Sequence, residues 1–335
     1  MDLSTQYLGL ELRNPLVASA SPLSNTADGV RALADAGVGA VVLFSLFEEQ
    51  LRREAARNAV LADAGTESFA ESLSYLPYGA DADPGPGRYL DLLERAVAAV
   101  DIPVIASLNG VTTGGWTDYA IALERAGAAA IELNIYHLPG DPLFPGRDVE
   151  TRHVEILTTV KAVVKVPVAV KMSPYYSSTG EMAQRLDRAG ADGLVLFNRF
   201  LQPDVDPETL TVTAGFGLSS PAEARLPRAW IALLAGRVRA SLAATTGVED
   251  AADVARYLLA GADVVMTASA LLRHGPQHAG VLLDGLSAWL ARKGFATVAD
   301  ARGLLSVPAE TDQVAFERAA YVGALQAANQ AHGPW

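Results

Sequence analysis

The stretch RALADAGVGAVVL, residues 31–43, joins a helical pattern to a buried strand. Its apolar residues recur at helical spacing up to Gly37, and a run of Val, Ala and Leu follows. The same pattern recurs as IALERAGAAAIEL (121–133), AQRLDRAGADGLVL (183–196) and VARYLLAGADVVM (254–266). Glycine suits the left-handed residue that ends a helix, and an all-apolar run suits a strand covered on both faces. The repeated unit predicts a parallel sheet covered by helices.

Further strand and helix patterns lie between these repeats. Eight strands are expected, at residues 16–20, 40–45, 104–108, 130–134, 168–172, 193–198, 240–245 and 263–268. Helical patterns separate most of them, at residues 28–36, 87–100, 117–126, 149–164, 181–189, 222–235, 250–259 and 277–293. Eight βα units in 335 residues are typical of an α/β protein with a single (β/α)8 TIM barrel domain over residues 1–335. A doubly wound open sheet is the alternative, but no Gly-x-Gly-x-x-Gly follows the first strand.

The composition is that of an acidic globular enzyme. Half of the residues are hydrophobic and 19% are charged, so a large core is expected. No apolar run approaches the roughly 18 residues of a membrane span, and the first residues do not resemble a signal peptide, which favours the cytoplasm. The net charge of −12 argues against nucleic acid or an anionic membrane as the main partner. The absence of cysteine excludes disulfides, cysteine-ligated iron–sulfur clusters and a cysteine nucleophile.

Two long segments interrupt the barrel pattern, residues 48–86 after the second strand and 201–221 after the sixth. Long loops at the carboxyl ends of barrel strands often cover or line an active site, whereas the alternative is an ordinary insertion or an oligomer contact. Within the second segment, TLTVT (209–213) is expected to form half of an antiparallel pair. The opening YLGLELRNPLVAS (7–19) predicts an N-terminal hairpin that leads into the first strand.

Polar residues end several predicted barrel strands, at the edge where βα loops form active sites. Asn109, Asn134 and Asn198 end strands three, four and six, and Lys171 lies in strand five. Amides both donate and accept hydrogen bonds, which suits the edge of a heterocycle better than a metal. No metal site is predicted, because no His-x-His, His-Glu-x-x-His or Asp-x-Asp motif ends a strand.

The last two strands end in the turns TTGV (245–248) and TASAL (267–271). The first is followed by the helix expected at Asp250, and the second by the helix expected near Gln277. Backbone amides and helix N-termini after strands seven and eight of a barrel commonly bind a phosphate dianion. The two turns together therefore predict a ligand that carries a phosphate.

Five segments carry a resemblance to a known family, and they occur in order along nearly the whole barrel. They are NPLVASA (14–20), ELN (132–134), VKMSP (170–174), LFN (196–198) and TTGVEDAADVARYLLAGADVVMTASAL (245–271). Together they resemble the dihydroorotate dehydrogenases, which are FMN-binding (β/α)8 barrels. The segments ELNIY and FNRF resemble a divergent branch of that family, described as dihydroorotate dehydrogenase-like.

The resemblance implies an FMN site on the rim described above. Lys171 would contact the pyrimidine end of the isoalloxazine, where positive charge stabilises the anionic reduced flavin. The alternative for Lys171 is a strand-end lysine that is paired with a carboxylate. Two residue pairs match the phosphate turns of the family, Thr246–Gly247 and Ala268–Ser269. The residues expected to bind the cofactor are Ala18, Ser19, Asn109, Asn134, Lys171, Asn198, Thr246, Gly247, Ala268 and Ser269.

The segment that carries the catalytic base of the family differs in this chain. The family has Cys or Ser after ELN, followed by Pro-Asn, whereas this chain reads ELNIYHLPGDP (132–142). His137 aligns with the base, and Leu138-Pro139 replaces Pro-Asn. Histidine titrates near neutral pH and is a competent base, so we predict His137 and Lys171 as the catalytic residues. Tyr136 is a weaker candidate as a proton donor, and His137 could instead be a polar loop residue that is hydrogen-bonded to a neighbour.

The substrate positions of the family also differ here. The family lysine after strand two falls near Phe44-Ser45, and AESLSYLPYG (70–79) replaces an asparagine-rich substrate loop. Losing amides that hold orotate changes substrate preference strongly. Arg199 could receive a carboxylate as a bidentate pair, or it could simply face solvent. The residues expected to contact substrate are Asn134, Tyr136, Asn198 and Arg199.

These patterns predict an FMN-dependent oxidoreductase acting on CH–CH groups. It would move hydride between a C–C bond of a small cyclic carbonyl substrate, dihydroorotate or another, and flavin N5, and an unidentified acceptor would reoxidise the flavin. The family's role is in pyrimidine metabolism. Two alternatives stay open: a non-redox lyase or aldolase with Lys171 as a Schiff base, and a flavin-binding protein without turnover. A homodimer is expected from the resemblance.

Overall fold

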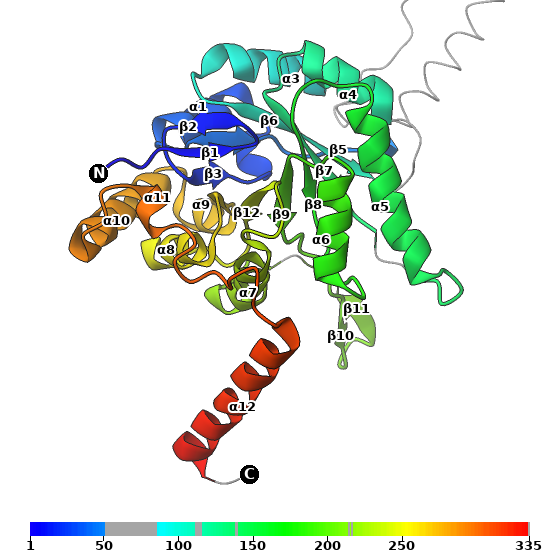
Figure 1. Ribbon diagram of the computed structural model, residues 1–335. Helices are drawn as coiled ribbons and strands as arrows, with labels where there is room; N and C mark the ends of the chain where they lie inside the picture. Colours follow the sequence, from blue (N-terminus) through cyan, green and yellow to red (C-terminus); the bar gives the residue numbers. More distant parts are fainter. Residues whose placement is uncertain (51–85, 111–115, 138–139, 214, 216, 334–335) are drawn as a thin grey trace, which may run out of the picture.

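The structure, a computed structural model, describes residues 1–50, 86–110, 116–137, 140–213, 215 and 217–333. Within them, eight parallel strands form a closed barrel surrounded by helices (Figure 1). The strands are β3 (Leu16–Ala18), β4 (Ala40–Val42), β6 (Val104–Gly110), β7 (Ala130–Ile135), β8 (Val168–Lys171), β9 (Gly193–Leu196), β12 (Ser241–Ala244) and β13 (Val264–Thr267). Each pairs with the next in sequence, and β13 pairs with β3 to close the barrel. The predicted (β/α)8 TIM barrel and its eight strands are confirmed.

The helices of the outer ring occupy the predicted ranges within a few residues. They are α1 (Ala27–Asp35), α3 (Pro86–Ala99), α4 (Trp116–Arg125), α5 (Gly146–Lys161), α6 (Thr179–Arg188), α7 (Arg225–Leu234), α8 (Ala251–Ala260) and α10 (His278–Lys293). The 3-10 turns η1 (Pro22–Ser24) and η2 (Pro221–Ala224) precede α1 and α7. Three further helices were not predicted: α9 (Ser269–His274), α11 (Val298–Ala301) and α12 (Gln313–His332).

The glycines that end the helices of the four repeats have the expected left-handed conformation. Gly37, Gly127, Gly190 and Gly261 all have positive φ, between 92° and 116°. At Gly261, which ends α8 with φ 116°, a Cβ atom would also lie 2.6 Å from the Cβ of Ala235. A residue with a side chain is therefore excluded there both by backbone conformation and by packing.

The N-terminal hairpin closes the amino end of the barrel. Strands β1 (Thr5–Tyr7) and β2 (Leu10–Leu12) pair antiparallel, as the sequence predicts, and Tyr7, Leu8 and Leu12 pack against the residues that fill the barrel interior. The Leu8 amide donates to Oγ of Ser241, the first residue of β12. Gly193 begins β9, and a Cβ atom there would lie 2.4 Å from Leu8 Cδ2, so the hairpin needs this glycine.

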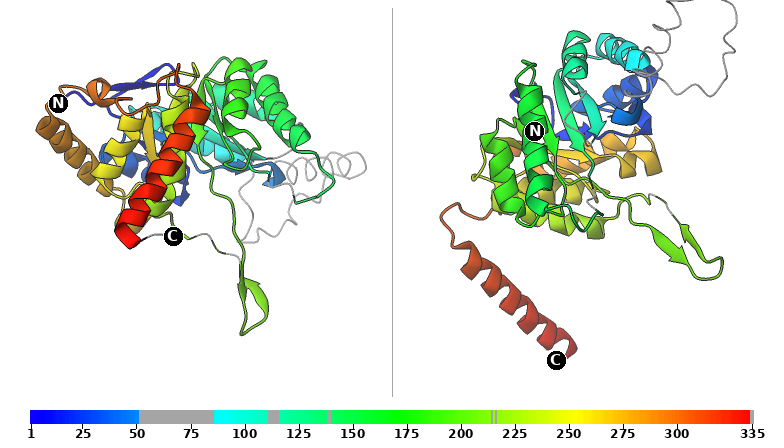
Figure 2. Two further views of the ribbon diagram at one scale, coloured as in Figure 1. Left: turned by 60° about the horizontal axis from the view of Figure 1, so that its bottom comes forward. Right: turned by 90° about the vertical axis from the view of Figure 1, so that its right-hand side faces the viewer.

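The two long segments both follow strands at the carboxyl end of the barrel. In the second, β10 (Asp204–Asp206) and β11 (Thr211–Thr213) form the expected antiparallel pair, which projects from the barrel (Figure 2). Just before the first, β5 (Leu46–Phe47) pairs with β6. Residues 51–85, which include the predicted replacement segment at 70–79, lie outside the described residues, and so do Leu138 and Pro139.

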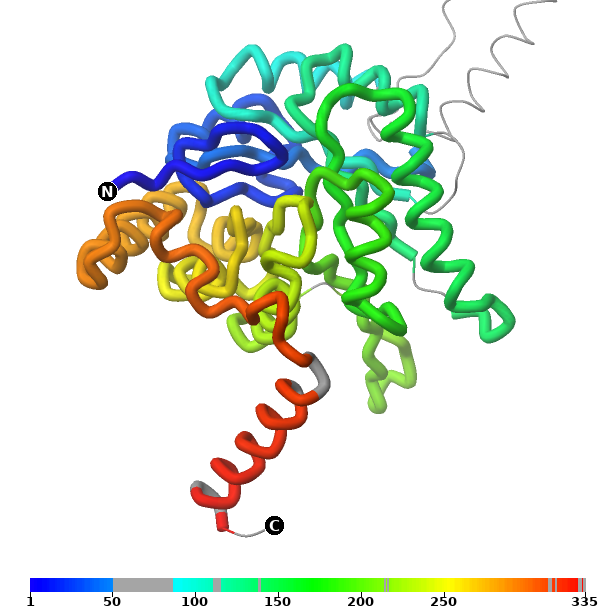
Figure 3. The backbone as a smooth tube through the Cα atoms, viewed as in Figure 1, coloured from blue at the N-terminus to red at the C-terminus, as the bar shows by residue number. Residues whose placement is uncertain are grey.

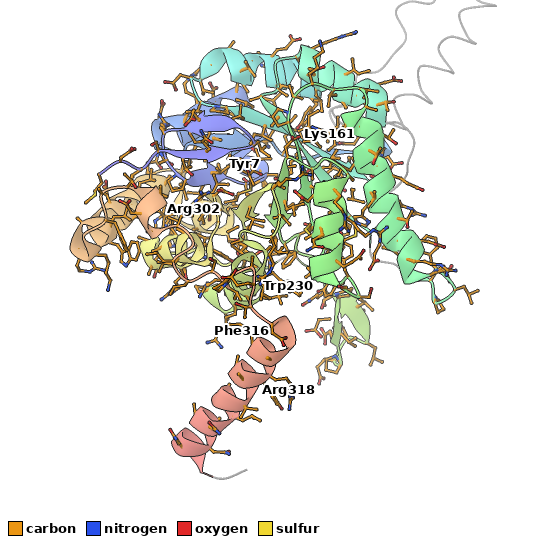
Figure 4. The ribbon with its side chains drawn as sticks, viewed as in Figure 1. Tyr7, Lys161, Trp230, Arg302, Phe316 and Arg318 are labelled. Atoms are coloured by element: carbon orange, nitrogen blue, oxygen red, sulfur yellow. The ribbon has the colours of Figure 1, made fainter. Side chains whose placement is uncertain are left out.

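The C-terminal helix α12 leaves the barrel after residues 302–312 and points away from it (Figures 2 and 3). Its side chains Phe316 and Arg318 are separated from the body of the molecule in Figure 4. Phe316, Tyr321 and Leu325 are 44%, 56% and 45% exposed. Among the described residues, no helix has the length and apolarity that crossing a membrane would require.

Candidate active site

Three polar side chains stand at one level across neighbouring strands. Asn109 of β6 is in register with Asn134 of β7, and Asn134 is in register with Lys171 of β8. Each is an even number of residues from Ile105, Ala130 or Ala169, which fill the barrel interior, so all three share the inward face of their strands. The geometry therefore brings these three sequence-predicted residues together at the carboxyl end of the barrel.

The amide of Asn198 joins this group from the segment after β9. Its Nδ2 donates to Oδ1 of Asn134 at 2.5 Å. On the other side, β3 ends at Ala18 and Ser19 follows it; both are almost fully buried, and the Ser19 amide donates to the carbonyl of Thr267 at 3.0 Å. Both side chains are small, and their contact with the cofactor stays a prediction.

Lys171 forms an ion pair with a residue that the sequence pattern did not single out. Its Nζ lies 3.5 Å from Oε1 of Glu132, which is two residues deeper in the barrel than Asn134 on β7. The side chains are 10% and 1% exposed. The expected alternative of a lysine paired with a carboxylate is therefore present, and it does not exclude a ligand above the ammonium group, because Glu132 approaches from the interior of the barrel.

The two turns predicted to hold a phosphate are linked by Ser219, which was not predicted. The Gly247 amide donates to Ser219 Oγ at 3.1 Å. Ser219 Oγ and the Ser219 amide each lie 2.9 Å from Ser269 Oγ as hydrogen-bond donors. Thr246 has φ 82°, and its carbonyl accepts from the Tyr257 hydroxyl at 2.7 Å. The turns therefore form one hydrogen-bonded unit with the segment that precedes α7.

Glycine is required at 247. Its φ is 70°, and a Cβ atom would lie 2.6 Å from the Ser220 carbonyl oxygen and 2.9 Å from the Ala224 amide nitrogen. Both neighbours are backbone atoms, which cannot move aside as a flexible side chain would. Residue 247 therefore keeps the backbone of this turn in close contact with the Ser219–Ala224 segment.

The helices near these turns differ from the prediction in two respects. The N-terminus of α8 is capped, because Asp250 and Asp253 form a reciprocal capping box that uses the Asp253 amide. The helix expected near Gln277 is present as α10, but the shorter α9 begins at Ser269, directly after β13.

His137 lies at the edge of the barrel, next to α5. Its ring contacts Phe144 edge-on with centroids 5.8 Å apart, and its Nε2 is buried without a hydrogen-bond partner in the described structure. Burial and the positive charge of Arg152 lower the pKa of His137 below the usual 6.5. A neutral imidazole with an unpartnered nitrogen can accept a proton, so the chemistry of the residue suits a base. The base role itself stays a prediction.

The other two predicted substrate residues, Tyr136 and Arg199, form hydrogen bonds with residues that follow β9. The Tyr136 hydroxyl accepts from the Leu201 amide at 2.8 Å, and its ring stacks on Phe200 at 4.6 Å. Arg199 donates from Nε to Glu223 at 3.0 Å and from a terminal nitrogen to the Gly217 carbonyl at 2.6 Å. A substrate carboxylate would therefore have to compete with Glu223 for Arg199.

Phe44 and Ser45, where the sequence lacks the family lysine, pack into the barrel wall. The Phe44 ring lies 5.2 Å from the ring of Tyr89 on α3, and Ser45 Oγ is 2.9 Å from Ser107 Oγ. This edge therefore presents an aromatic ring and a hydroxyl in place of an ammonium group. Among the residues that the structure describes, no cluster of His, Asp and Glu could hold a metal ion.

Two residues of the site were not predicted, for different reasons. Glu132 was visible inside the ELN segment, but the pattern alone did not show that it faces the barrel interior below Lys171. Ser219 lies in the long segment 201–221, where no helix or strand period fixes its position. The sequence GLSSP around it was the available signal, because a serine directly before proline commonly caps a helical turn, and Ser220 caps η2 here.

The amino-acid sequence is similar to those of known proteins over most of its length. The sequence model of the family described as "Dihydroorotate dehydrogenase" matches residues 2–290. A putative dihydroorotate dehydrogenase A (fumarate) of Aeropyrum pernix is 30% identical over 227 residues, 66% of this chain and 74% of that protein. The catalytic subunit of a dihydroorotate dehydrogenase B (NAD(+)) of Methanothermobacter thermautotrophicus is 27% identical over 320 residues, 90% and 98% of the two chains. The corresponding subunit of Methanocella arvoryzae is 30% identical over 300 residues, 88% and 95%.

Proposed function

The chain belongs to the dihydroorotate dehydrogenase family of oxidoreductases, and from that premise we propose that it is an FMN-dependent enzyme acting on CH–CH groups. The observation that carries the proposal is the row of Asn109, Asn134 and Lys171 at one level of three neighbouring strands. Amides and an ammonium group on one rim match the polar edge of a flavin ring, whose heteroatoms both donate and accept.

The residues at the far side of the rim fit the phosphate of the same ligand. Thr246 and Gly247 form a turn with positive φ at both residues, and Ser219 ties this turn to Ser269. Hydroxyl and backbone N–H donors that are gathered in such turns favour an anion. Gly247 keeps this turn against the Ser219–Ala224 segment and so fixes the place where the phosphate would bind, and Ala18, Ser19 and Ala268 are small enough to leave room for the flavin.

FMN would supply a hydride acceptor, N5, when bound. The chain must then bind the substrate, exclude water and take up the partner proton at an oxygen or nitrogen atom of its own. We propose His137 Nε2 as that atom, because it is neutral near pH 7 and unpartnered. Tyr136 is instead a weaker candidate as a proton donor, since its hydroxyl accepts from Leu201 and keeps its own proton.

The substrate is proposed to be a small cyclic carbonyl compound, dihydroorotate or another. Asn134, Asn198, Tyr136 and Arg199 would contact it, and the pairing of Arg199 with Glu223 argues that any substrate carboxylate is bound less directly than in a free arginine site. The relatives' names mention fumarate and NAD(+), which are the acceptors to test first. A dihydroorotate reaction would serve pyrimidine metabolism, and we propose a cytoplasmic location.

The Schiff-base alternative is weakened by the ion pair of Lys171. An ammonium group has no lone pair for attack on a carbonyl, and the Lys171 nitrogen is engaged by Glu132 at 3.5 Å. A flavin-binding protein without turnover stays the second reading, since the rim geometry serves binding and catalysis alike.

We further propose that the chain forms a homodimer through α12. No charged residue occurs between 319 and 331, and the described side chains of α12 are exposed almost throughout. The uncharged run exposes Tyr321, Val322 and Leu325, and a helix of 20 residues, about 30 Å long, offers a substantial contact surface. Packing of α12 from each copy against the other copy would bury both helices in a closed symmetric dimer.

The test is a visible spectrum of the purified protein, followed by anaerobic addition of dihydroorotate. A yellow protein that dihydroorotate bleaches would support both cofactor and substrate. A yellow protein that stays oxidised would keep the cofactor and reject this substrate. A colourless protein that does not bind added FMN, and in which borohydride traps a carbonyl compound on Lys171, would overturn the proposal in favour of the lyase.

A further inference from the structure

Glu132 is a charged side chain in the apolar interior of the barrel. It projects from the middle of β7, is 1% exposed, and lies between the interior residues Ala130 and Asn134 on the same face. Both of its carboxylate oxygens are buried, and neither makes a hydrogen bond within the described structure. An isolated carboxylate in such surroundings is strongly unfavourable, so the position calls for a partner of opposite charge.

The partner is Lys171. Its Nζ lies 3.5 Å from Glu132 Oε1, and its side chain is 10% exposed. The strand register explains the arrangement: Asn134 is level with Lys171, whereas Glu132 is level with Ala169, two residues deeper. The carboxylate therefore holds the ammonium group from below, and the upper side of the ammonium group remains directed toward the rim.

Tyr7 closes the same buried space from beneath. It belongs to the N-terminal hairpin, is 1% exposed, and its hydroxyl makes no hydrogen bond within the described structure. Burial, and to a smaller degree the negative charge of Glu132, raise the pKa of Tyr7 well above 10, so its hydroxyl stays neutral. Tyr7 therefore adds no charge to the pair, and Lys171 supplies the positive charge that lies beside Glu132. Figure 4 marks the position of Tyr7 within the molecule.

We propose that Glu132 is a positioning residue, which holds the ammonium group of Lys171 at the level of Asn109 and Asn134. A lysine side chain has several rotatable bonds and would otherwise extend toward solvent to hydrate its ammonium group. The ion pair removes that freedom and holds the charge at the cofactor-facing end of the barrel. The inference rests on the proposed function for its purpose, because Lys171 is there the residue that faces the flavin.

The test measures the amine of Lys171 directly, in protein without FMN. The chain has lysines only at 161, 165, 171 and 293, so their labelling by an amine-reactive reagent can be read separately by peptide mass spectrometry. In Glu132→Gln, the shape of the side chain is kept and its charge is lost. We expect labelling of Lys171 to become about tenfold faster or more, because a lysine released from the ion pair can extend its amine toward solvent, where the reagent reaches it.

Matched variants separate pairing from damage to the fold. Tyr7→Phe removes a hydroxyl from the same buried space without changing the charge and should leave Lys171 labelling at the wild-type rate. Glu132→Asp keeps the charge and should restore slow labelling at least in part. Exposed Lys293 should react equally in all variants. If Glu132→Gln fails to fold, the pair Lys171→Met and Glu132→Gln/Lys171→Met serves instead, and the double variant should be the more stable of the two.

The outcomes distinguish this inference from the proposed function. Unchanged Lys171 labelling in Glu132→Gln, or a double variant no more stable than Lys171→Met, would overturn the positioning role whatever the cofactor. Faster labelling in the variant, together with protection of Lys171 by FMN in wild type, would support both. Faster labelling without any protection by FMN would support the ion pair and reject the flavin contact.

Discussion

Replacing Gly247 by Ala tests whether the turn after β12 needs a bare backbone. Gly247 has φ 70°, and a Cβ atom would lie 2.6 Å from the Ser220 carbonyl oxygen and 2.9 Å from the Ala224 amide nitrogen. Two effects should add: the strain of a left-handed residue with a side chain, and the collision with backbone that is fixed by the Ser219 hydrogen bonds.

The size of each effect follows from the local geometry. A side chain in the left-handed region costs about 1–2 kcal/mol. Forcing an extra carbon into a well-packed contact typically costs about 1–3 kcal/mol more. Gly294 separates the two, because it has φ 80° and no atom within 4 Å of the place that a Cβ would occupy. Gly294→Ala should therefore lose about 1–2 kcal/mol, and Gly247→Ala about 2–5 kcal/mol.

The assay is urea unfolding of both variants, together with titration of each with FMN. Gly247→Ala should lose more unfolding free energy than Gly294→Ala and should bind FMN more weakly, whereas Gly294→Ala should bind FMN as wild type does. Equal loss of stability in the two variants would refute the steric argument. Wild-type FMN affinity in a folded Gly247→Ala protein would refute the assignment of this turn to the phosphate.

Four further predictions concern other parts of the molecule. Burial is the main cause that lowers the pKa of His153 below 6.5. The stability that comes from its neutral ring is therefore complete above pH 6.5 and is lost as the pH falls. His153→Gln should reduce the loss of unfolding free energy between about pH 7.5 and 5.5. His137→Ala should lower the rate of substrate-dependent flavin reduction by about 10²–10⁴-fold if His137 is the base, with FMN binding retained. Gly193→Ala should destabilise the barrel by about 1–3 kcal/mol in urea unfolding, because its Cβ meets Leu8, and Leu8→Ala should relieve that strain. Removing residues 312–335 should convert a dimer to a monomer in light scattering and should make the unfolding midpoint independent of protein concentration; a dimer that persists would reject α12 as the contact.

Most of the barrel was readable from the sequence because its signals are local. The Ala-Gly turns at 37, 127, 190 and 261 and the all-apolar runs after them indicated helices and strands whose order leaves few architectures. The short α9 and the exposed α12 were missed, since neither has the one-sided apolar pattern that marks a packed helix. Positions at strand ends followed as well, which is how Asn109, Asn134 and Lys171 were selected.

The amino-acid sequence by itself therefore determined the strand order, the carboxyl-end rim and the residue types on it, because hydrophobic period and glycine position are properties of neighbouring residues. Only the tertiary structure decided which of those residues meet. It paired Lys171 with Glu132, tied Asn198 to Asn134, engaged Arg199 with Glu223, and brought Ser219 between two turns far from it in the chain. Such contacts depend on barrel closure and strand register, which fix the distance between side chains that the sequence leaves unrelated.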